Sequence, residues 1–170
     1  WSSDVCSSDL ESNPLLLACT KQADDRITSV ASFPNGNKLA TGSFDGTVVV
    51  WEKSITPSGN TWKRRPIGRH EPPDEVVCLA VVGGGTQQTI VTGSRDGNIH
   101  TWDVALALDS DEPPTTIPVT QSVAHDKTLA HHGGVGCLAP VEQERLFLSG
   151  GRRDCDIKMW KLESEPTGTH

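Results

Sequence analysis

One pattern recurs three times in this chain and constrains its fold more than any other feature. Each copy contains an apolar pair, a Ser/Thr-Gly step, a turn Asp and an alternating stretch that ends in Trp. The copies are Leu39–Trp51, Ile90–Trp102 and Phe147–Trp160, and their closing tryptophans lie 51 and 58 residues apart. A unit that recurs at this length predicts a repeat architecture in which similar units stack on their neighbours.

The units predict strands. Short segments rich in Val, Ile, Thr and Trp are bounded by Gly, Asn and Asp, which is typical of β-structure. Asp45-Gly46 and Asp96-Gly97 stand between apolar runs and indicate hairpins, because Gly accepts positive φ. A second strand segment precedes each copy, and three more strands are expected, one before the first unit and two between the units. The preceding segments are Ile27–Phe33, Val76–Val82 and Val135–Val141, and the other three are Pro14–Cys19, Thr61–Arg65 and Pro118–Ala124.

These residues resemble WD40 repeats, a family whose units form the four-stranded blades of a β-propeller. The resemblance implies an all-β fold: a partial β-propeller of about three four-stranded antiparallel WD40 blades, belonging to a larger and typically seven-bladed propeller. On this basis repeat 1 covers residues 11–52, repeat 2 covers 53–103 and repeat 3 covers 104–162, followed by a tail over 163–170.

The start and the length of the chain suggest a piece of a longer protein. Residues 1–10 lack strand or helix periodicity and resemble the translation of sequencing-adaptor DNA, so we expect a non-native or disordered leader. Three units fall short of the roughly 4–8 blades that close a propeller. We therefore expect an internal fragment whose partners include the remaining blades of the parent propeller. Its unpaired strand edges should promote self-association.

The resemblance also implies a hydrogen-bonded set of His, Ser/Thr, Asp and Trp in each blade. The hydroxyl accepts from the indole N–H, and the imidazole bridges hydroxyl and carboxylate. The second repeat matches this set best, whereas Gln22-Ala23 stands where the first repeat needs Gly-His. In the third repeat His132 is an alternative to His131. The expected structural residues are Thr41, Asp45, Trp51, His70, Thr92, Asp96, Trp102, His131, Ser149, Asp154 and Trp160.

The same residue types occur in hydrolase triads, but a structural role is favoured here. The set recurs in each unit together with a Trp, while a triad is needed only once, and no Gly-x-Ser-x-Gly elbow is present. We therefore expect no catalytic residue. The group His125, Asp126, His131 and His132 matches no common zinc spacing, so we expect no metal site and no cofactor.

Candidate partner-binding residues precede the turn Asp, a position that the family projects onto the rim where partners bind. They are Phe44, Arg95 and Arg153, with Arg152 beside the last. Arginine binds carboxylates and phosphates bidentately, and both Arg and aromatic residues are enriched among binding anchors. The expected partners are other proteins, with acidic or phosphorylated segments as candidates. The alternative, that these arginines only solvate exposed turns, stays open.

The composition bears on the class of function. The net charge of −7 disfavours broad nucleic-acid contact, and no apolar run is long enough to span a membrane. We expect a non-enzymatic scaffold for protein–protein interaction and multiprotein assembly. An RNA-associated scaffold, in a ribonucleoprotein or in ribosome biogenesis, is the alternative and depends on Trp62–Arg65; a propeller module of an enzyme is a third. Five cysteines without a pairing pattern favour an intracellular setting, nucleus or cytoplasm being left open.

Overall fold

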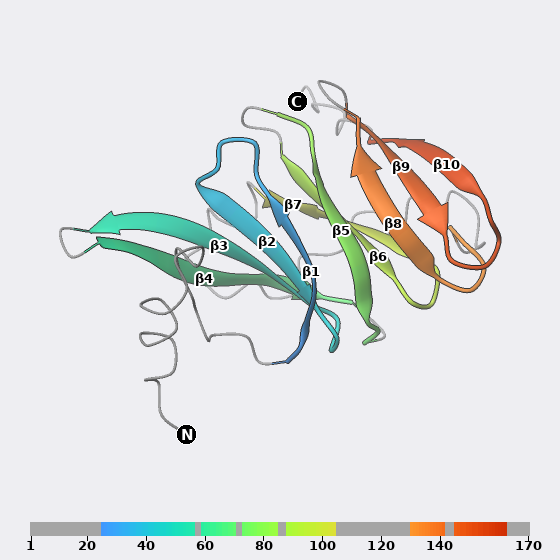
Figure 1. Ribbon diagram of the computed structural model, residues 1–170, viewed down its shortest axis with the longest axis horizontal. Coiled ribbons are helices and arrows are strands. Elements are labelled where there is room, and N and C mark those ends of the chain that lie inside the picture. Colours follow the sequence, from blue (N-terminus) through green and yellow to red (C-terminus); the bar gives the residue numbers. More distant parts are fainter. Residues whose placement is uncertain are drawn as a thin grey trace, which may run out of the picture.

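The computed structural model describes residues 25–56, 59–70, 73–84, 88–104, 130–141 and 145–162. Every element assigned within these residues is a strand, and the strands form three antiparallel sheets that stand side by side along the chain (Figure 1). The prediction of an all-β chain built from about three repeated units is therefore confirmed.

The first sheet has four strands in the order in which the chain supplies them. They are β1 (Ile27–Ser32), β2 (Lys38–Ser43), β3 (Thr47–Thr56) and β4 (Gly59–Arg69). The outermost strand, β4, is longer than the expected Thr61–Arg65 and pairs with β3, with Trp51 opposite Arg64. Because the connection between β3 and β4 is short, the chain folds straight back on itself. A strand from repeat 2 of the sequence thus completes the sheet of repeat 1.

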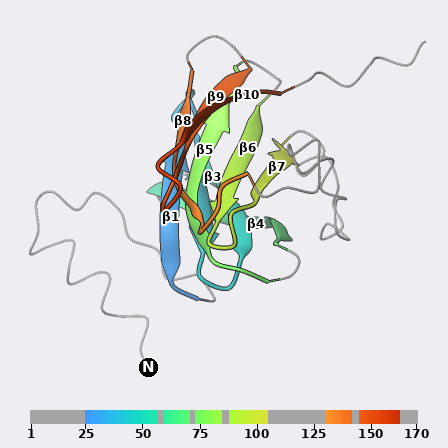
Figure 2. The same ribbon diagram turned by 90° about the vertical axis from the view of Figure 1, so that its right-hand side faces the viewer.

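The second and third sheets each have three strands within the described residues. They are β5 (Val76–Val82), β6 (Thr89–Ser94) and β7 (Ile99–Asp103), then β8 (Val135–Pro140), β9 (Leu146–Gly151) and β10 (Ile157–Lys161). Viewed from the side, the third sheet lies in front of the second (Figure 2). The expected strands over Pro14–Cys19 and Pro118–Ala124, the leader 1–10 and the tail 163–170 lie outside the described residues.

The three sheets share one strand register. The hydroxyl residue on the middle strand faces Val30, Leu79 or Leu138 on the preceding strand. Each of these pairings has an irregularity at the same place, next to its first pair. Residues of the three sheets can therefore be compared position by position.

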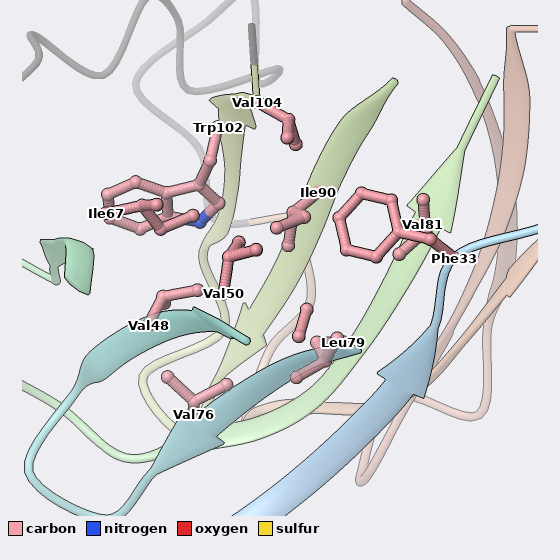
Figure 3. Packing of buried hydrophobic residues seen from close by; sticks show 11 residues of the cluster. Phe33, Val48, Val50, Ile67, Val76, Leu79, Val81, Ile90, Trp102 and Val104 are labelled. Atoms are coloured by element: carbon pink, nitrogen blue, oxygen red, sulfur yellow. The ribbon is translucent and has the colours of Figure 1, made fainter. Parts of the chain in front are cut away.

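Two buried clusters join the sheets. The first lies between the first and second sheets, where Val50 and Ile67 pack with Ile90 and Trp102 (Figure 3). The second lies between the second and third sheets and contains Phe147, which is fully buried. Burial of one such side chain contributes about 1.5–3 kcal/mol, so each cluster stabilises the packing of one sheet on the next.

The turn after the middle strand differs in the third sheet. Gly46 and Gly97 follow the turn Asp with φ values of 89° and 99°, but Cys155 occupies the corresponding place with φ of 59°. A side chain in this left-handed region costs about 1–2 kcal/mol. The third turn therefore carries local strain that the first two avoid.

Replacing Phe147 with Ala should lower the free energy of unfolding by about 3–5 kcal/mol, because it leaves a cavity in the second cluster. Phe147 lies 6.3 Å from Trp160 between ring centroids, so tryptophan fluorescence during denaturant titration reports the loss directly. The matched Phe44→Ala change, at an exposed ring, should cost less than about 1 kcal/mol. Equal losses in the two variants would contradict this packing.

Candidate functional site

The turns β2–β3, β6–β7 and β9–β10 lie along one side of the molecule, the lower side in Figure 1. Backbone hydrogen bonds link successive units there: His70 N donates to Gly46 O at 3.1 Å, and His131 N donates to Gly97 O at 3.0 Å. This rim carries both the buried histidines and the predicted partner-binding residues.

An unbroken hydrogen-bonded chain runs through the third sheet. Trp160 Nε1 donates to Ser149 Oγ at 2.7 Å, and His131 Nε2 lies 2.7 Å from the same hydroxyl. His131 Nδ1 lies 2.8 Å from Asp154 Oδ2. Since Nδ1 faces a carboxylate, it carries the proton, and the hydroxyl of Ser149 donates to Nε2. Both His131 and Ser149 are buried, so every polar group in this interior chain has a partner.

Asp154 is held as an anion by its neighbours. Burial acts to raise the pKa of its carboxyl, but the backbone N–H of Asp156, the ring of His131 and the backbone N–H of His132 outweigh that effect. The pKa of Asp154 therefore lies below its ordinary value. His131 rather than His132 occupies the interior position, while His132 is exposed and contributes only its backbone N–H, at 3.1 Å.

In the second sheet the corresponding series of hydrogen bonds is broken between the histidine and the carboxylate. Trp102 Nε1 donates to Thr92 Oγ1 at 2.9 Å, and His70 Nε2 lies 2.8 Å from that hydroxyl. Asp96 instead accepts from Ser94 Oγ and from Asn98 N, the latter at 2.8 Å. His70 Nδ1 is buried and has no hydrogen-bond partner in the described part of the chain. The second repeat, which matches the set best in sequence, thus has a less complete hydrogen-bonded set than the third.

A serine two residues before the turn Asp explains the difference. Ser43 Oγ donates to Asp45 Oδ1 at 2.5 Å, and Ser94 holds Asp96 in the same way. The third sheet has Gly151 at this register position. A Cβ on Gly151 would lie 2.6 Å from His131 Nδ1, so only glycine leaves room for the His–Asp contact. The Ser-x-Asp spacing at Ser43–Asp45 and Ser94–Asp96 is the sequence signal that sets the first two turns apart from the third.

The first sheet keeps only part of the set. Trp51 Nε1 donates to Thr41 Oγ1 at 2.9 Å, and residues 25–56 contain no histidine. A small hollow lies there, and Thr41, Asp45 and Trp51 are among its lining residues. It occupies the place that an imidazole fills in the other two sheets. Gln22-Ala23 lies outside the described residues.

His70 also belongs to an aromatic stack in the second sheet. Its ring lies 4.2 Å from that of His100 between centroids and stacks in turn on Trp102. Burial is the main cause that lowers the pKa of His70, to about 3, and the charge of His100 adds to it. Burial likewise lowers the pKa of His100. Both rings are therefore neutral at physiological pH, and neither is poised to exchange protons with a substrate near pH 7.

Three of the predicted partner-binding residues converge on one turn. A Cβ on Gly134 would lie 2.9 Å from the backbone oxygen of Arg95 and 3.3 Å from Arg152 Cδ, and one on Gly133 would lie 2.9 Å from Arg153 Cβ. The structure thus brings Arg95, Arg152 and Arg153 together around Gly133–Gly134.

The electrostatic partners of these arginines are few. Arg95 Nη1 lies 3.7 Å from Glu75 Oε2, and its side chain remains 65% exposed. Arg152 and Arg153 are exposed, and no carboxylate of the described residues lies within salt-bridge distance of either guanidinium. Surface pairs at such separations contribute about 0–1 kcal/mol, so a ligand anion can displace the one that exists.

Phe44 lies apart from the arginines, on the turn of the first sheet. Its exposed ring packs beneath Arg26, whose Cζ lies 4.1 Å from the ring centroid. The predicted rim residues therefore form two separate groups.

The basic strip Trp62–Arg65 forms an ion pair within the first sheet. Arg65 Nε lies 3.2 Å from Glu52 Oε2, and Lys38 Nζ lies 3.1 Å from Glu52 Oε1. One carboxylate therefore offsets two cations on this surface, and the charge available for a phosphate backbone is reduced.

No group of three or more His, Cys, Asp or Glu side chains among the described residues is arranged to hold a metal ion; His125 and Asp126 lie outside them. No helix in that part of the chain is long and apolar enough to cross a membrane.

Comparison with known proteins identifies the family. The model of the "WD domain, G-beta repeat" family matches residues 12–52, 65–103 and 124–161. The chain belongs to the WD40 repeat family. This membership supports a protein-interaction scaffold in general terms.

The matched WD40 relatives are much longer than this chain. Mouse (Mus musculus) striatin-4 is 23% identical over 172 residues, which cover 83% of this chain and 22% of the relative. The guanine nucleotide-binding protein subunit beta of Zea mays is 25% identical over 137 residues, covering 81% of this chain and 32% of the relative. Echinoderm microtubule-associated protein-like 2 of Rattus norvegicus is 32% identical over 103 residues, covering 60% and 13%.

Gly151→Ser should break the His131–Asp154 contact and lower the free energy of unfolding by about 1–3 kcal/mol, because buried polar groups lose their partners. Chemical denaturation measures the loss. Gly84→Ser is the matched control, since a Cβ there meets nothing within 4 Å, and it should change stability by about 0.5 kcal/mol or less. A stable Gly151→Ser variant would show that the contact is dispensable.

The stability of the second sheet should fall as the pH drops below about 6.5. His70 is neutral when folded, with its pKa near 3, but takes up a proton when unfolded, at its ordinary pKa of 6.5. The unfolded state therefore binds more protons throughout this window, and acid favours unfolding.

Between about pH 7.5 and 5.5, His70 alone should lower the free energy of unfolding by about 1.4 kcal/mol. In His70→Gln this increment should vanish from the pH dependence of denaturation midpoints, while His132→Gln, at an exposed position, should retain it. Parallel pH profiles for wild type and His70→Gln would refute the assignment.

Proposed function

We propose that this WD40 chain is a non-enzymatic scaffold that assembles protein complexes by holding an acidic or phosphorylated segment of a partner at its rim. The observation that carries the proposal is the convergence of Arg95, Arg152 and Arg153 around Gly133–Gly134. A guanidinium group binds a carboxylate or a phosphate bidentately, and this turn gathers the backbone or side-chain stems of three arginines.

The surroundings of the arginines favour a ligand over solvation alone. Arg152 and Arg153 carry no internal carboxylate partner within the described residues, although Asp154 follows them directly. That carboxylate is engaged by His131 at 2.8 Å, so it is turned into the sheet. Its removal from the surface leaves the neighbouring positive charge for an external anion.

The proposal that the chain is not an enzyme rests on how its acid and base side chains are already bonded. His131 and Asp154 are joined within the hydrogen-bonded chain of the third sheet, and His70 is stacked and neutral. Each of these side chains is hydrogen-bonded or stacked within a repeat that ends in Trp. An intracellular setting, nuclear or cytoplasmic, fits the absence of disulfides at the described cysteines Cys78, Cys137 and Cys155.

Reversing two of the charges tests the proposal. Fluorescence anisotropy with a panel of labelled acidic and phosphoserine peptides should give binding that Arg95→Glu plus Arg153→Glu weakens at least about tenfold. This is the expectation if even one charge-assisted hydrogen bond worth about 1.5–3 kcal/mol is lost.

Lys53→Glu plus Lys63→Glu is the matched control. It makes the same change in net charge at two exposed lysines of β3 and β4, away from the rim turns, and should leave the affinity unchanged. If both double variants weakened peptide binding equally, the effect would come from overall charge and not from the rim site. If the arginine variant bound the peptides as tightly as the wild type, the rim site would be excluded. RNA binding lost only in the lysine variant would favour the RNA-associated alternative.

A further inference from the structure

The three rim turns can be compared residue by residue, because a backbone hydrogen bond marks the same place in each sheet. The N–H of the residue after the middle strand donates to the carbonyl of the residue before the first strand, at 2.9, 3.1 and 2.9 Å in chain order. We call these two positions of each sheet its rim pair. The rim pairs are Phe44 with Arg26, Arg95 with Glu75, and Arg152 with Gly134.

In the first two sheets the side chains of the rim pair contact each other. The Cζ atom of Arg26 lies 4.1 Å from the ring centroid of Phe44. Arg95 Nη1 lies 3.7 Å from Glu75 Oε2. The chain thus supplies a partner of matching chemistry within each of these turns: a cation for the aromatic ring and a carboxylate for the guanidinium group.

The third sheet lacks this internal partner. Its rim pair joins Arg152 to Gly134, which has no side chain, and Gly133 stands where the second sheet has Asp74. The missing acidic side chains belong to positions 133 and 134 of the third unit itself, inside the described residues. The third turn therefore places an arginine where the second turn has an ion pair, but without the counterpart of Glu75.

A second arginine is inserted into the same turn. The third turn has one residue more than the other two between the middle strand and the turn Asp, and both of the residues there are arginines. A Cβ built on Gly133 would lie 2.6 Å from Arg153 Cδ, and one built on Gly134 would lie 3.3 Å from Arg152 Cδ. Both charged side chains therefore extend from one small surface, and an external anion would relieve their mutual repulsion.

We propose that a partner protein supplies to the third turn, from outside, the acidic pair that Asp74 and Glu75 supply to the second turn from within the chain. Arg152 and Arg153 each take one carboxylate of two neighbouring acidic side chains on the partner, in the bidentate geometry that guanidinium groups favour. The ligand is thereby narrowed from any acidic or phosphorylated segment to a pair of carboxylates, and this assignment rests on the proposed function of the rim.

The occupant of the second turn is the reason to prefer carboxylates. Glu75 lies on Arg95, and Asp74 Oδ2 accepts a hydrogen bond from Asp96 N at 2.6 Å. Two separate carboxylates on neighbouring residues therefore satisfy one rim turn of this fold. A phosphoserine carries a similar charge on a single group, so it would bring all of that charge to one point between two arginines that lie on different glycines.

Glu75 is, on this basis, an internal competitor of the ligand. It holds Arg95, and Arg95 borders the third turn, since a Cβ built on Gly134 would lie 2.9 Å from Arg95 O. Loss of the Glu75 carboxylate would leave Arg95 available to the ligand as a third cation.

Three labelled peptides of nearly equal charge test the ligand class by fluorescence anisotropy on the full 170-residue chain. Each is a short Gly/Ser peptide. The first carries neighbouring Asp and Glu, the second carries the same two residues separated by several Gly/Ser residues, and the third carries one phosphoserine in their place. The wild type should bind the first at least about fivefold more tightly than either of the others, because only the first presents two carboxylates to two adjacent guanidinium groups.

Single substitutions locate the site. Arg152→Gln and Arg153→Gln should each weaken binding of the neighbouring-acid peptide at least about tenfold, because a charge-assisted hydrogen bond is lost. Lys161→Gln is the matched control, since it removes the same charge from an exposed residue at the end of β10 away from the turn; it should change the affinity less than about twofold. Near-ultraviolet circular dichroism should show the wild-type fold in all three variants, whose altered positions are exposed.

The role of Glu75 has its own measurement. Glu75→Gln should tighten binding of the neighbouring-acid peptide at least about threefold at about 0.15 M salt, where long-range charge effects are screened. In an Arg95→Gln background the same change should bring no gain, because its effect depends on releasing Arg95. An equal gain in both backgrounds, or no gain in either, would overturn Glu75 as the internal counterpart of the ligand.

Three outcomes would overturn the assignment of a carboxylate pair: equal affinity for the two arrangements of the acids, tighter binding of the phosphoserine peptide, or binding that survives both arginine changes. Tighter phosphoserine binding that still needs Arg152 and Arg153 would leave the proposed rim site intact. If none of the three peptides showed arginine-dependent binding, the proposed function would fail as well, so the two failures are distinguishable.

Discussion

The architecture depends on one hydrogen bond that is made in all three sheets: an indole N–H donates to a hydroxyl on the neighbouring strand. The distances are 2.9 Å for Trp51 to Thr41, 2.9 Å for Trp102 to Thr92 and 2.7 Å for Trp160 to Ser149. Satisfying the one polar atom of tryptophan lets its large ring be buried without a desolvation penalty. The ring can then serve as packing surface, as Trp102 does against Gly68 of the first sheet.

Around this constant bond the turn carboxylate has two alternative partners. Where a serine stands two residues before it, the carboxylate closes its own turn, as Asp45 and Asp96 do. In the third sheet Gly151 holds the register position of that serine, three residues before Asp154, and Asp154 reaches the histidine while it also accepts from Asp156 N in its own turn. The missing hydroxyl and the longer turn therefore accompany the extension of the hydrogen-bonded chain into the interior. Repeats of similar sequence thus differ in whether the turn carboxylate is hydrogen-bonded to the buried histidine.

The strands and their mutual register could be predicted from the sequence because alternation, Asp-Gly turns and closing tryptophans are local signals. The membership of β4 in the first sheet could not be predicted from the sequence. It depends on which sheet edge the polypeptide pairs with after the hairpin that follows β3. The candidate histidines His70 and His131 could be named from spacing, but not their hydrogen bonding, which depends on competition for one carboxylate. The convergence of Arg95 with Arg152 and Arg153 is likewise a tertiary result: it follows from the second sheet stacking on the third.

The backbone bonds along the rim give the stack a direction. The carbonyl of Gly46 is satisfied by the N–H of His70, and that of Gly97 by the N–H of His131, so each turn is completed by the unit that follows it in the chain. Detaching the third sheet leaves the carbonyl of Gly97 without its donor, and detaching the first leaves the N–H of His70 without its acceptor. Each boundary therefore carries one backbone bond whose loss leaves a polar group unpaired, and this couples the order of neighbouring units.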